Sequence, residues 1–351
     1  FNINKNLKFD NVKVESIVDL DELIFKKKNL NLKLYFPKSS EEINLEDHKI
    51  IINYDKNKLD IKGNGNILLE KKLDSLSYQL IKNKNNISFD TKINLKNNSL
   101  IIDFLDYEKK ENLSSLISIK GNLKVNKKLK FDLINLKEKN DEITIKGLHL
   151  NKNFKIIDIE NFNINYRNNK KIINKLNLKK DNSNFIIEGE IFDASKLINN
   201  IMDDDKENSS FFQNLNSKVK IKIKKTYIDE VNYINNIYGN ISYNNSKLND
   251  LELEGVFPSE KKINLSIKKN NNEETITQLS SAYPKPLVKR YDFIKGFEEG
   301  YLDFYSSKKG DVSNSVLVID NFKVKEVPIF AKLLSLASLQ GMADLLTGEG
   351  I

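Results

Sequence analysis

Short runs of alternating apolar and polar residues recur along almost the whole sequence, and they constrain its fold more than any other feature. In one run, Val219, Ile221 and Ile223 alternate with lysines, and in another Leu251 and Leu253 alternate with acidic residues. This period of two is typical of strands with one face in a core and one in water. We therefore expect a mostly β fold, an elongated and twisted antiparallel sheet or groove of repeated strand meanders.

Turn residues separate these runs. Residues 96–99 read Lys-Asn-Asn-Ser and residues 243–246 read Tyr-Asn-Asn-Ser, and Asn tolerates the left-handed backbone of tight hairpins. A chain of 351 residues would hold roughly fifteen to twenty such strands. The runs share no strict sequence period, so we interpret them as a degenerate strand repeat.

Three segments interrupt the strand pattern and predict helices. Residues 193–202 begin with an N-capping Asp, residues 284–295 begin with Pro and precede Gly296, and residues 327–346 form an apolar C-terminal helix. The last helix carries apolar side chains around nearly its whole circumference, at Phe330, Leu333, Leu334, Leu336, Leu339, Met342, Leu345 and Leu346. Lys332 and Asp344 argue against a membrane span, so we expect it to plug the end of an apolar β trough.

The amino-acid composition mainly limits which partners the chain can bind. The formal net charge is +8, but Lys dominates and is spread along the strands, alternating with apolar residues in 218–225. This pattern indicates the wet faces of amphipathic strands, so we expect no nucleic-acid partner, while an anionic lipid surface stays open as an alternative. Cysteine is absent, which excludes disulfides and thiol chemistry.

The sequence predicts no enzyme, no cofactor and no metal site. Its two histidines, His48 and His149, have no second imidazole nearby, and neither belongs to a nucleophile motif. Asp203 to Asp205 lack the alternating ligands of a calcium loop, and Gly63-Asn-Gly65 lacks the third glycine of a dinucleotide fingerprint. A glycosidase would need two carboxylates about 5 to 9 Å apart in a polar cleft, and no motif marks such a pair.

An uncovered apolar sheet face would exceed what a soluble monomer tolerates, so something must cover it. A second sheet, closure of the sheet on itself, a partner or acyl chains would each suffice. We predict that the face lines a lipid groove, with apolar contacts and no covalent chemistry. The predicted lining residues are Val219, Ile221, Ile223, Leu251, Leu253, Ile263, Leu265 and Ile267.

The C-terminal part of the sequence resembles a known family. Residues 315–351 contain Asp-Asn-Phe after a strand, a Pro-started Leu-rich helix with Leu-Ser-Leu-Ala-Ser-Leu-Gln-Gly, and Gly-Glu-Gly. Residues 188–195 and 296–304 also fit, and together they resemble the C-terminal region of AsmA-like proteins of the YhdP branch. The likeness covers residues 185–351, and the turn at 281–286 departs from the family pattern.

The resemblance implies a domain division and a cellular setting. Residues 1–184 would be an N-terminal β-meander or groove segment, and residues 185–351 the AsmA-like C-terminal region. We expect the sequence to be a fragment of a longer, Gram-negative cell-envelope protein whose inner-membrane anchor lies outside it. The present residues would then lie in the periplasm.

The implied function is non-catalytic lipid transport. A periplasmic β-groove would shield or conduct phospholipid acyl chains between the inner and outer membrane, in outer membrane biogenesis. The partners would be phospholipid, the membrane and other envelope proteins. The alternative is a structural or assembly scaffold that binds envelope proteins by β-augmentation, with a well-filled interior and no co-purified lipid.

Overall fold

The computed structural model describes residues 2–3, 9–10, 12–26, 32–40, 42–124, 129–152, 154–202, 217–244, 247–270, 273–291 and 297–324. The chain divides into two compact units, unit 1 with residues 1–171 and unit 2 with residues 172–351. The boundary predicted from sequence, at 184/185, falls inside one strand of unit 2, β16 (Asn184–Asp193).

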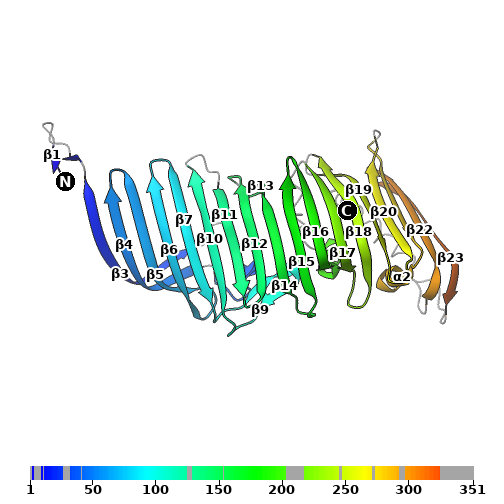
Figure 1. Ribbon diagram of the computed structural model, residues 1–351, viewed down its shortest axis with the longest axis horizontal. Coiled ribbons are helices and arrows are strands. Elements are labelled where there is room, and N and C mark those ends of the chain that lie inside the picture. Colours follow the sequence, from blue (N-terminus) through cyan, green and yellow to red (C-terminus); the bar gives the residue numbers. More distant parts are fainter. Residues whose placement is uncertain are drawn as a thin grey trace. The chain divides into compact units, whose positions relative to one another are not determined.

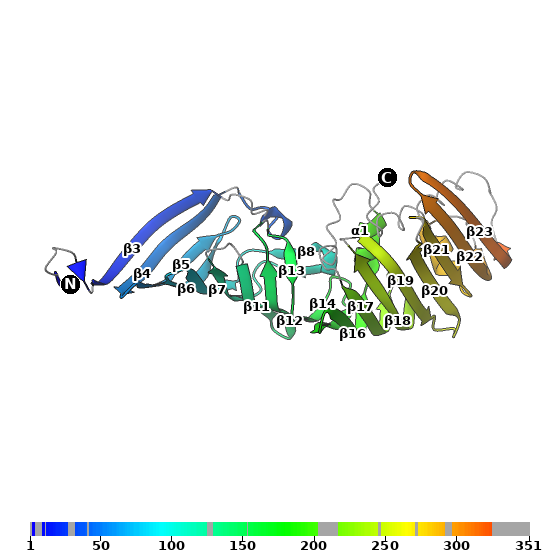
Figure 2. The same ribbon diagram turned by 90° about the horizontal axis from the view of Figure 1, so that it is seen from above.

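Unit 1 is an antiparallel meander in which each long strand pairs with the next (Figure 1). Its long strands are β3 (Lys13–Lys26), β4 (Glu42–Asp55), β5 (Lys58–Leu68), β6 (Leu73–Asn83), β7 (Asn86–Leu95), β10 (Ser115–Lys124), β11 (Leu129–Glu138), β12 (Asp141–Leu150) and β14 (Asn161–Arg167). Short elements complete it: β1 (Asn2–Ile3), β2 (Phe9–Asp10), η1 (Leu32–Leu34), β8 (Leu100–Ile102), η2 (Asp103–Leu105), β9 (Tyr107–Lys109) and β13 (Ile156–Asp158). Figure 2 shows the curvature of β3 and β4.

Two-residue turns close several hairpins in both units. Asp55 pairs with Lys58 around a turn in which Lys56 and Asn57 have φ of 45° and 69°. Lys84, Lys139 and Asn182 also have positive φ, at the β6–β7, β11–β12 and β15–β16 turns. Positive φ in two-residue loops matches the twist of the flanking strands, which fixes the hairpin register.

Unit 2 has the strands β15 (Ile173–Asp181), β16, β17 (Lys218–Tyr227), β18 (Tyr233–Asn244), β19 (Lys247–Val256), β20 (Lys262–Lys269), β21 (Thr275–Ser281), β22 (Phe297–Lys309) and β23 (Val312–Val324). Its described residues also include the helices α1 (Ser195–Met202) and α2 (Lys285–Tyr291). Neighbouring strands are antiparallel except β16 and β17, which are parallel. The expected antiparallel arrangement does not hold at this pair, because the connection from β16 to β17 contains α1, and parallel neighbours need such a crossover.

The predicted short helices are confirmed in position. The Asp193 carboxylate accepts the Ser195 N–H at 2.9 Å and so bonds the first residue of α1, while the Ile198 N–H donates to Ala194 O at 2.9 Å. α2 follows Pro284, which is suited to the start of a helix. Strand β16 leads into α1 and β22 begins at Phe297, as the sequence pattern indicated. The predicted plug helix at 327–346, with Phe330, Leu333, Leu334, Leu336, Leu339, Met342, Leu345 and Leu346, lies outside the described residues.

Candidate functional site

The sheet of unit 1 carries rows of apolar side chains that cross its strands on one face. One row runs through Ile52, Ile61, Leu80, Phe89, Gly121 and Phe131. The next runs through Ile50, Gly63, Tyr78, Thr91, Ile119 and Ile134. The opposite face carries a polar row, Asn64, Ser77, Lys92, Ser118 and Asn135. Because facing side chains in adjacent strands are close neighbours, the two apolar rows form one continuous surface.

This apolar surface is only half-buried. Ile52, Ile61, Leu80, Phe89 and Phe131 all have intermediate exposure. Along β7, the residues from Asn86 to Thr91 are all half-buried, although they alternate between the two faces. Side chains between two packed layers would be nearly inaccessible on the inner face. As far as the described residues extend, the middle of unit 1 is therefore a single layer whose apolar face is open.

One end of this face is covered. Leu95, Leu105 and Tyr107 are at most 5% exposed. The Tyr107 ring packs edge-on against Tyr166 with centroids 5.4 Å apart, and the Tyr166 hydroxyl donates to Leu105 O. The β8–β9 hairpin and η2 thus cap the end of the sheet.

Two buried side chains of opposite charge, Asp74 and Lys109, hold the loop before this hairpin. The Asp74 carboxylate accepts the backbone N–H groups of Lys96, Asn97 and Asn98 at 2.8, 2.7 and 3.2 Å. The Lys109 ammonium donates to the carbonyls of Lys96 and Asn98 at 3.0 and 2.5 Å. Burial lowers the pKa of Lys109, while the charge of Asp74 opposes that shift. The loop is therefore fixed through both its donors and its acceptors.

In unit 2, the eight predicted lining residues share one face, as the alternation required. One row contains Val219, Ile241, Leu251 and Ile267; the next contains Ile221, Gly239, Leu253 and Leu265; Ile223 and Ile263 lie in a third. Val219, Leu251 and Ile267 are at most 3% exposed, and Ile221 and Ile223 are 9% and 7% exposed. Leu253, Ile263 and Leu265 are half-buried. Their role as a lipid lining stays a prediction.

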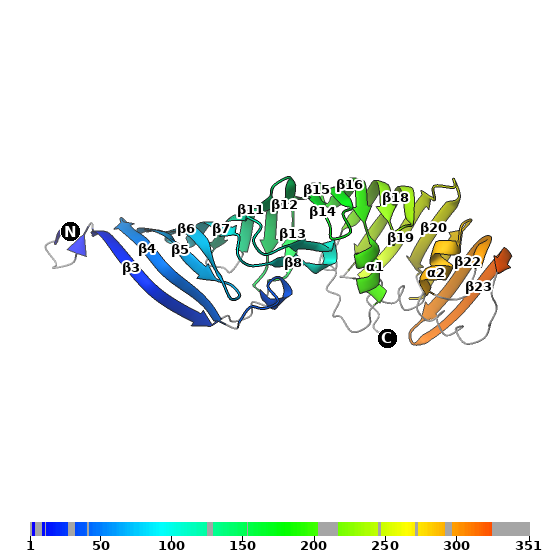
Figure 3. The same ribbon diagram turned by 90° about the horizontal axis from the view of Figure 1, so that it is seen from below.

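Both helices of unit 2 pack on this apolar face (Figure 3). Val288 of α2 is completely buried in a cluster with Leu279, Leu302 and Phe304. Ile198 of α1 packs against a second cluster built on Ile228, Ile234 and Phe257. Ile263 packs against both clusters, so this region of unit 2 has a filled core.

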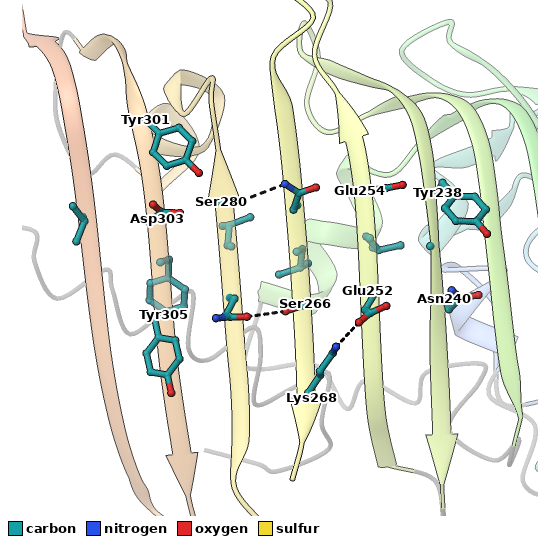
Figure 4. Close-up of a pocket in the computed structure, with 18 of the residues that line it drawn as sticks. Tyr238, Asn240, Glu252, Glu254, Ser266, Lys268, Ser280, Tyr301, Asp303 and Tyr305 are labelled. Atoms are coloured by element: carbon teal, nitrogen blue, oxygen red, sulfur yellow. Dashed lines mark hydrogen bonds and ion pairs between the residues drawn. The ribbon is translucent and has the colours of Figure 1, made fainter.

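The polar face of unit 2 is hollowed by a depression of about 690 Å³ (Figure 4). One row across its floor contains Tyr238, Glu254, Asn264, Ser280, Asp303 and Val318. The adjacent row contains Asn240, Glu252, Ser266, Gln278, Tyr305 and Val316. The sequence alone does not reveal this hollow, because its residues come together only through the strand registers.

Each of the two histidines lies close to an oxygen atom of a neighbouring residue. His48 is 1% exposed, its Nε2 lies 2.8 Å from Asn66 O, and its ring occupies the space beside Gly65. His149 Nδ1 lies 3.9 Å from an Asp158 carboxylate oxygen. Among the described residues, no three His, Cys, Asp or Glu side chains gather into a metal-binding group.

In comparisons with known proteins, no protein-family model, curated protein or solved structure matches this chain. In the part of the chain that the structure describes, no helix is both long and apolar enough to cross a bilayer.

The open apolar rows of unit 1 were missed as candidate lining residues. The alternation at Ile87, Phe89, Ile93 and Leu95 is as clear as that at 219–223. Alternation reveals which side chains share a face, but it does not reveal whether another layer covers them.

Proposed function

We propose that the open apolar face of unit 1 shelters phospholipid acyl chains. In this proposal the chain is a non-catalytic β-groove segment of an AsmA-like protein, anchored in the inner membrane and extending into the periplasm. The groove shields or conducts lipid between the inner and outer membrane. The observation that carries the proposal is the pair of half-buried apolar rows running across unit 1 from β4 to β11.

The dimensions and chemistry suit an acyl chain. Six strands at a spacing of about 4.8 Å make each row roughly 24 Å long. A bilayer core about 30 Å thick contains two acyl chains end to end, so one chain is roughly 15 Å long. Each methylene removed from water contributes about 0.8 kcal/mol, so partial shelter along such a row gives appreciable affinity. The polar reverse face stays in water.

The predicted lining residues of unit 2 have a secondary part in this proposal. Val219, Leu251 and Ile267 pack against protein, whereas the half-buried Leu253 and Leu265 are the ones that a lipid would contact. In this proposal, unit 1 therefore provides the main lipid-binding surface.

Lipid extraction followed by mass spectrometry tests the proposal. The chain would be purified from envelope membranes in mild detergent, beside the double variant Leu80→Lys/Phe89→Lys. The matched control is Ser77→Lys, on the polar face of the same strand as Leu80. We expect phospholipid at a reproducible ratio in the parent and the control, and at least a fivefold reduction in the double variant.

Circular dichroism verifies that the double variant keeps its strands. Lipid-free, folded parent protein would refute the proposal, and so would equal lipid retention in all three proteins.

Strand addition at β3 is the second candidate function. Within unit 1, β3 pairs with β4 alone among the described residues, and Ile17 and Ile24 on β3 are 63% and 52% exposed. A partner strand joining this edge would cover them, as in β-augmentation. A synthetic peptide with the sequence of residues 42–55, which is the β4 strand, should then slow hydrogen exchange in β3. No slowing, or slowing equal to that caused by a scrambled peptide, would exclude this function.

A further inference from the structure

The polar hollow of unit 2 combines exposed aromatic rings with hydrogen-bonding side chains. Tyr238, Tyr301 and Tyr305 are 42%, 41% and 42% exposed, and Figure 4 shows them at both ends of the floor. Between them lie the amide and hydroxyl groups of Asn264, Ser280 and their neighbours. The two contacts linking these groups, from Asn264 to Ser280 and from Ser266 to Gln278, are both 3.4 Å long. Such weak bonds are readily exchanged for bonds to a ligand.

The charge of the hollow restricts what it binds. It contains three carboxylates, Glu252, Glu254 and Asp303, and one ammonium, Lys268, which gives a formal charge of −2 in a chain of net charge +8. Glu252 is paired with Lys268, whereas the carboxylates of Glu254 and Asp303 make no hydrogen bond or ion pair with any described residue. The unpaired carboxylates disfavour phosphates and other anions over the middle of the floor, and acyl chains gain nothing from its polar groups. At the β18 edge, Lys220 and Lys222 extend the two rows beyond Asn240 and Tyr238, and the Lys220 ammonium lies 5.6 Å from the centre of the Tyr238 ring.

We propose that this hollow binds a glycan strand, with preference for amine-bearing sugars. Sugar rings present C–H faces, which pack on exposed tyrosines, and hydroxyls, which exchange hydrogen bonds with amides and carboxylates. The floor crosses six strands, roughly 24 Å at the usual strand spacing, so it accommodates several sugars in a row. The two unpaired carboxylates add a charge-assisted bond to each sugar ammonium that they meet.

The carboxylate spacing favours binding over hydrolysis. Glu254 on β19 and Asp303 on β22 are three strands apart, which is roughly 14 Å. Glycosidases that use two carboxylates place them about 5 to 9.5 Å apart. Glu252 lies closer to Glu254, but its charge is already paired with Lys268.

Calorimetric titration of the full chain tests the proposal. The probes are the hexamer of N-acetylglucosamine and its deacetylated, amine-bearing counterpart. We expect both to bind, the amine-bearing hexamer at least threefold more tightly. Tyr238→Ala and Tyr305→Ala should each weaken binding about tenfold, and Asp303→Asn should remove the preference for the amine. The matched control is Tyr35→Ala, a 44% exposed tyrosine in unit 1, which should bind as the parent does.

Several results would overturn the inference. One is the absence of binding of either hexamer at millimolar concentration by protein whose thermal transition matches the parent. Another is unchanged affinity in both tyrosine variants. A hexalysine peptide that binds more tightly than the sugars, with affinity lost in Asp303→Asn but kept in the tyrosine variants, would instead identify a cationic peptide site.

Discussion

The apolar face of unit 1 and that of unit 2 arise from the same alternating pattern but end in different environments. In the middle of unit 1, Ile61, Leu80 and Phe89 are half-buried in a single layer. In unit 2, Leu251 and Leu302 are 3% and 0% exposed. An alternating strand thus specifies an apolar face without specifying its cover.

The connections between strands account for this difference. In unit 1, the β4–β5, β6–β7 and β11–β12 connections are two-residue turns, which are too short to fold back over the sheet. In unit 2, the connections after β16 and β21 contain α1 and α2, which pack on the apolar face. Among the described residues, unit 1 has such insertions in its β7–β10 connection, which contains the β8–β9 hairpin and η2, and in its β3–β4 connection, which contains η1.

Alanine substitutions on the two apolar faces should change the free energy of unfolding the most. Leu302→Ala in unit 2 removes a completely buried side chain, and we expect it to lower the free energy of unfolding by about 2 to 5 kcal/mol. Leu80→Ala in unit 1 removes a half-buried one and should cost about 1 kcal/mol. Urea denaturation followed by circular dichroism measures both. Equal losses would mean that the two faces are covered alike.

A second variant tests whether the cover in unit 1 is local. Asp74→Ala leaves the N–H groups of Lys96, Asn97 and Asn98 without their acceptor, and we expect a loss of about 3 kcal/mol. Hydrogen exchange should accelerate at residues 96–109 and stay unchanged in β4 and β5. Ser77→Ala, at an exposed position, is the control. Uniform acceleration throughout unit 1 would contradict a local cap.

Two glycine-to-alanine substitutions, one in each unit, should have the smallest effects on stability. A Cβ on Gly239 in unit 2 would lie 1.8 Å from Glu252 O, so Gly239→Ala should force the β18–β19 backbones apart and cost about 1 to 3 kcal/mol. A Cβ on Gly63 in unit 1 would meet the Tyr78 side chain, which is half-buried and can turn away. Gly63→Ala should therefore cost less than about 1 kcal/mol by the same urea assay. The reverse order would show that the face of unit 1 is the more tightly packed of the two.

Much of the fold follows from local sequence, because alternation and turn chemistry act between near neighbours. The mostly β class and the positions of α1 and α2 are predictable, and the eight residues from Val219 to Ile267 do share one face. The parallel pairing of β16 with β17 is not predictable in this way, since the direction of a strand after a long crossover depends on where the crossover packs.

The sequence by itself determined which side chains are apolar, which alternate, and therefore which face of each strand avoids water. Only the tertiary structure decided that Leu251 is packed while Leu80 is half-open, because burial depends on segments distant in the chain. The hollow between Tyr238 and Tyr305 likewise depends on registers across six strands, and a shift of one residue in any of them would turn its side chains to the other face.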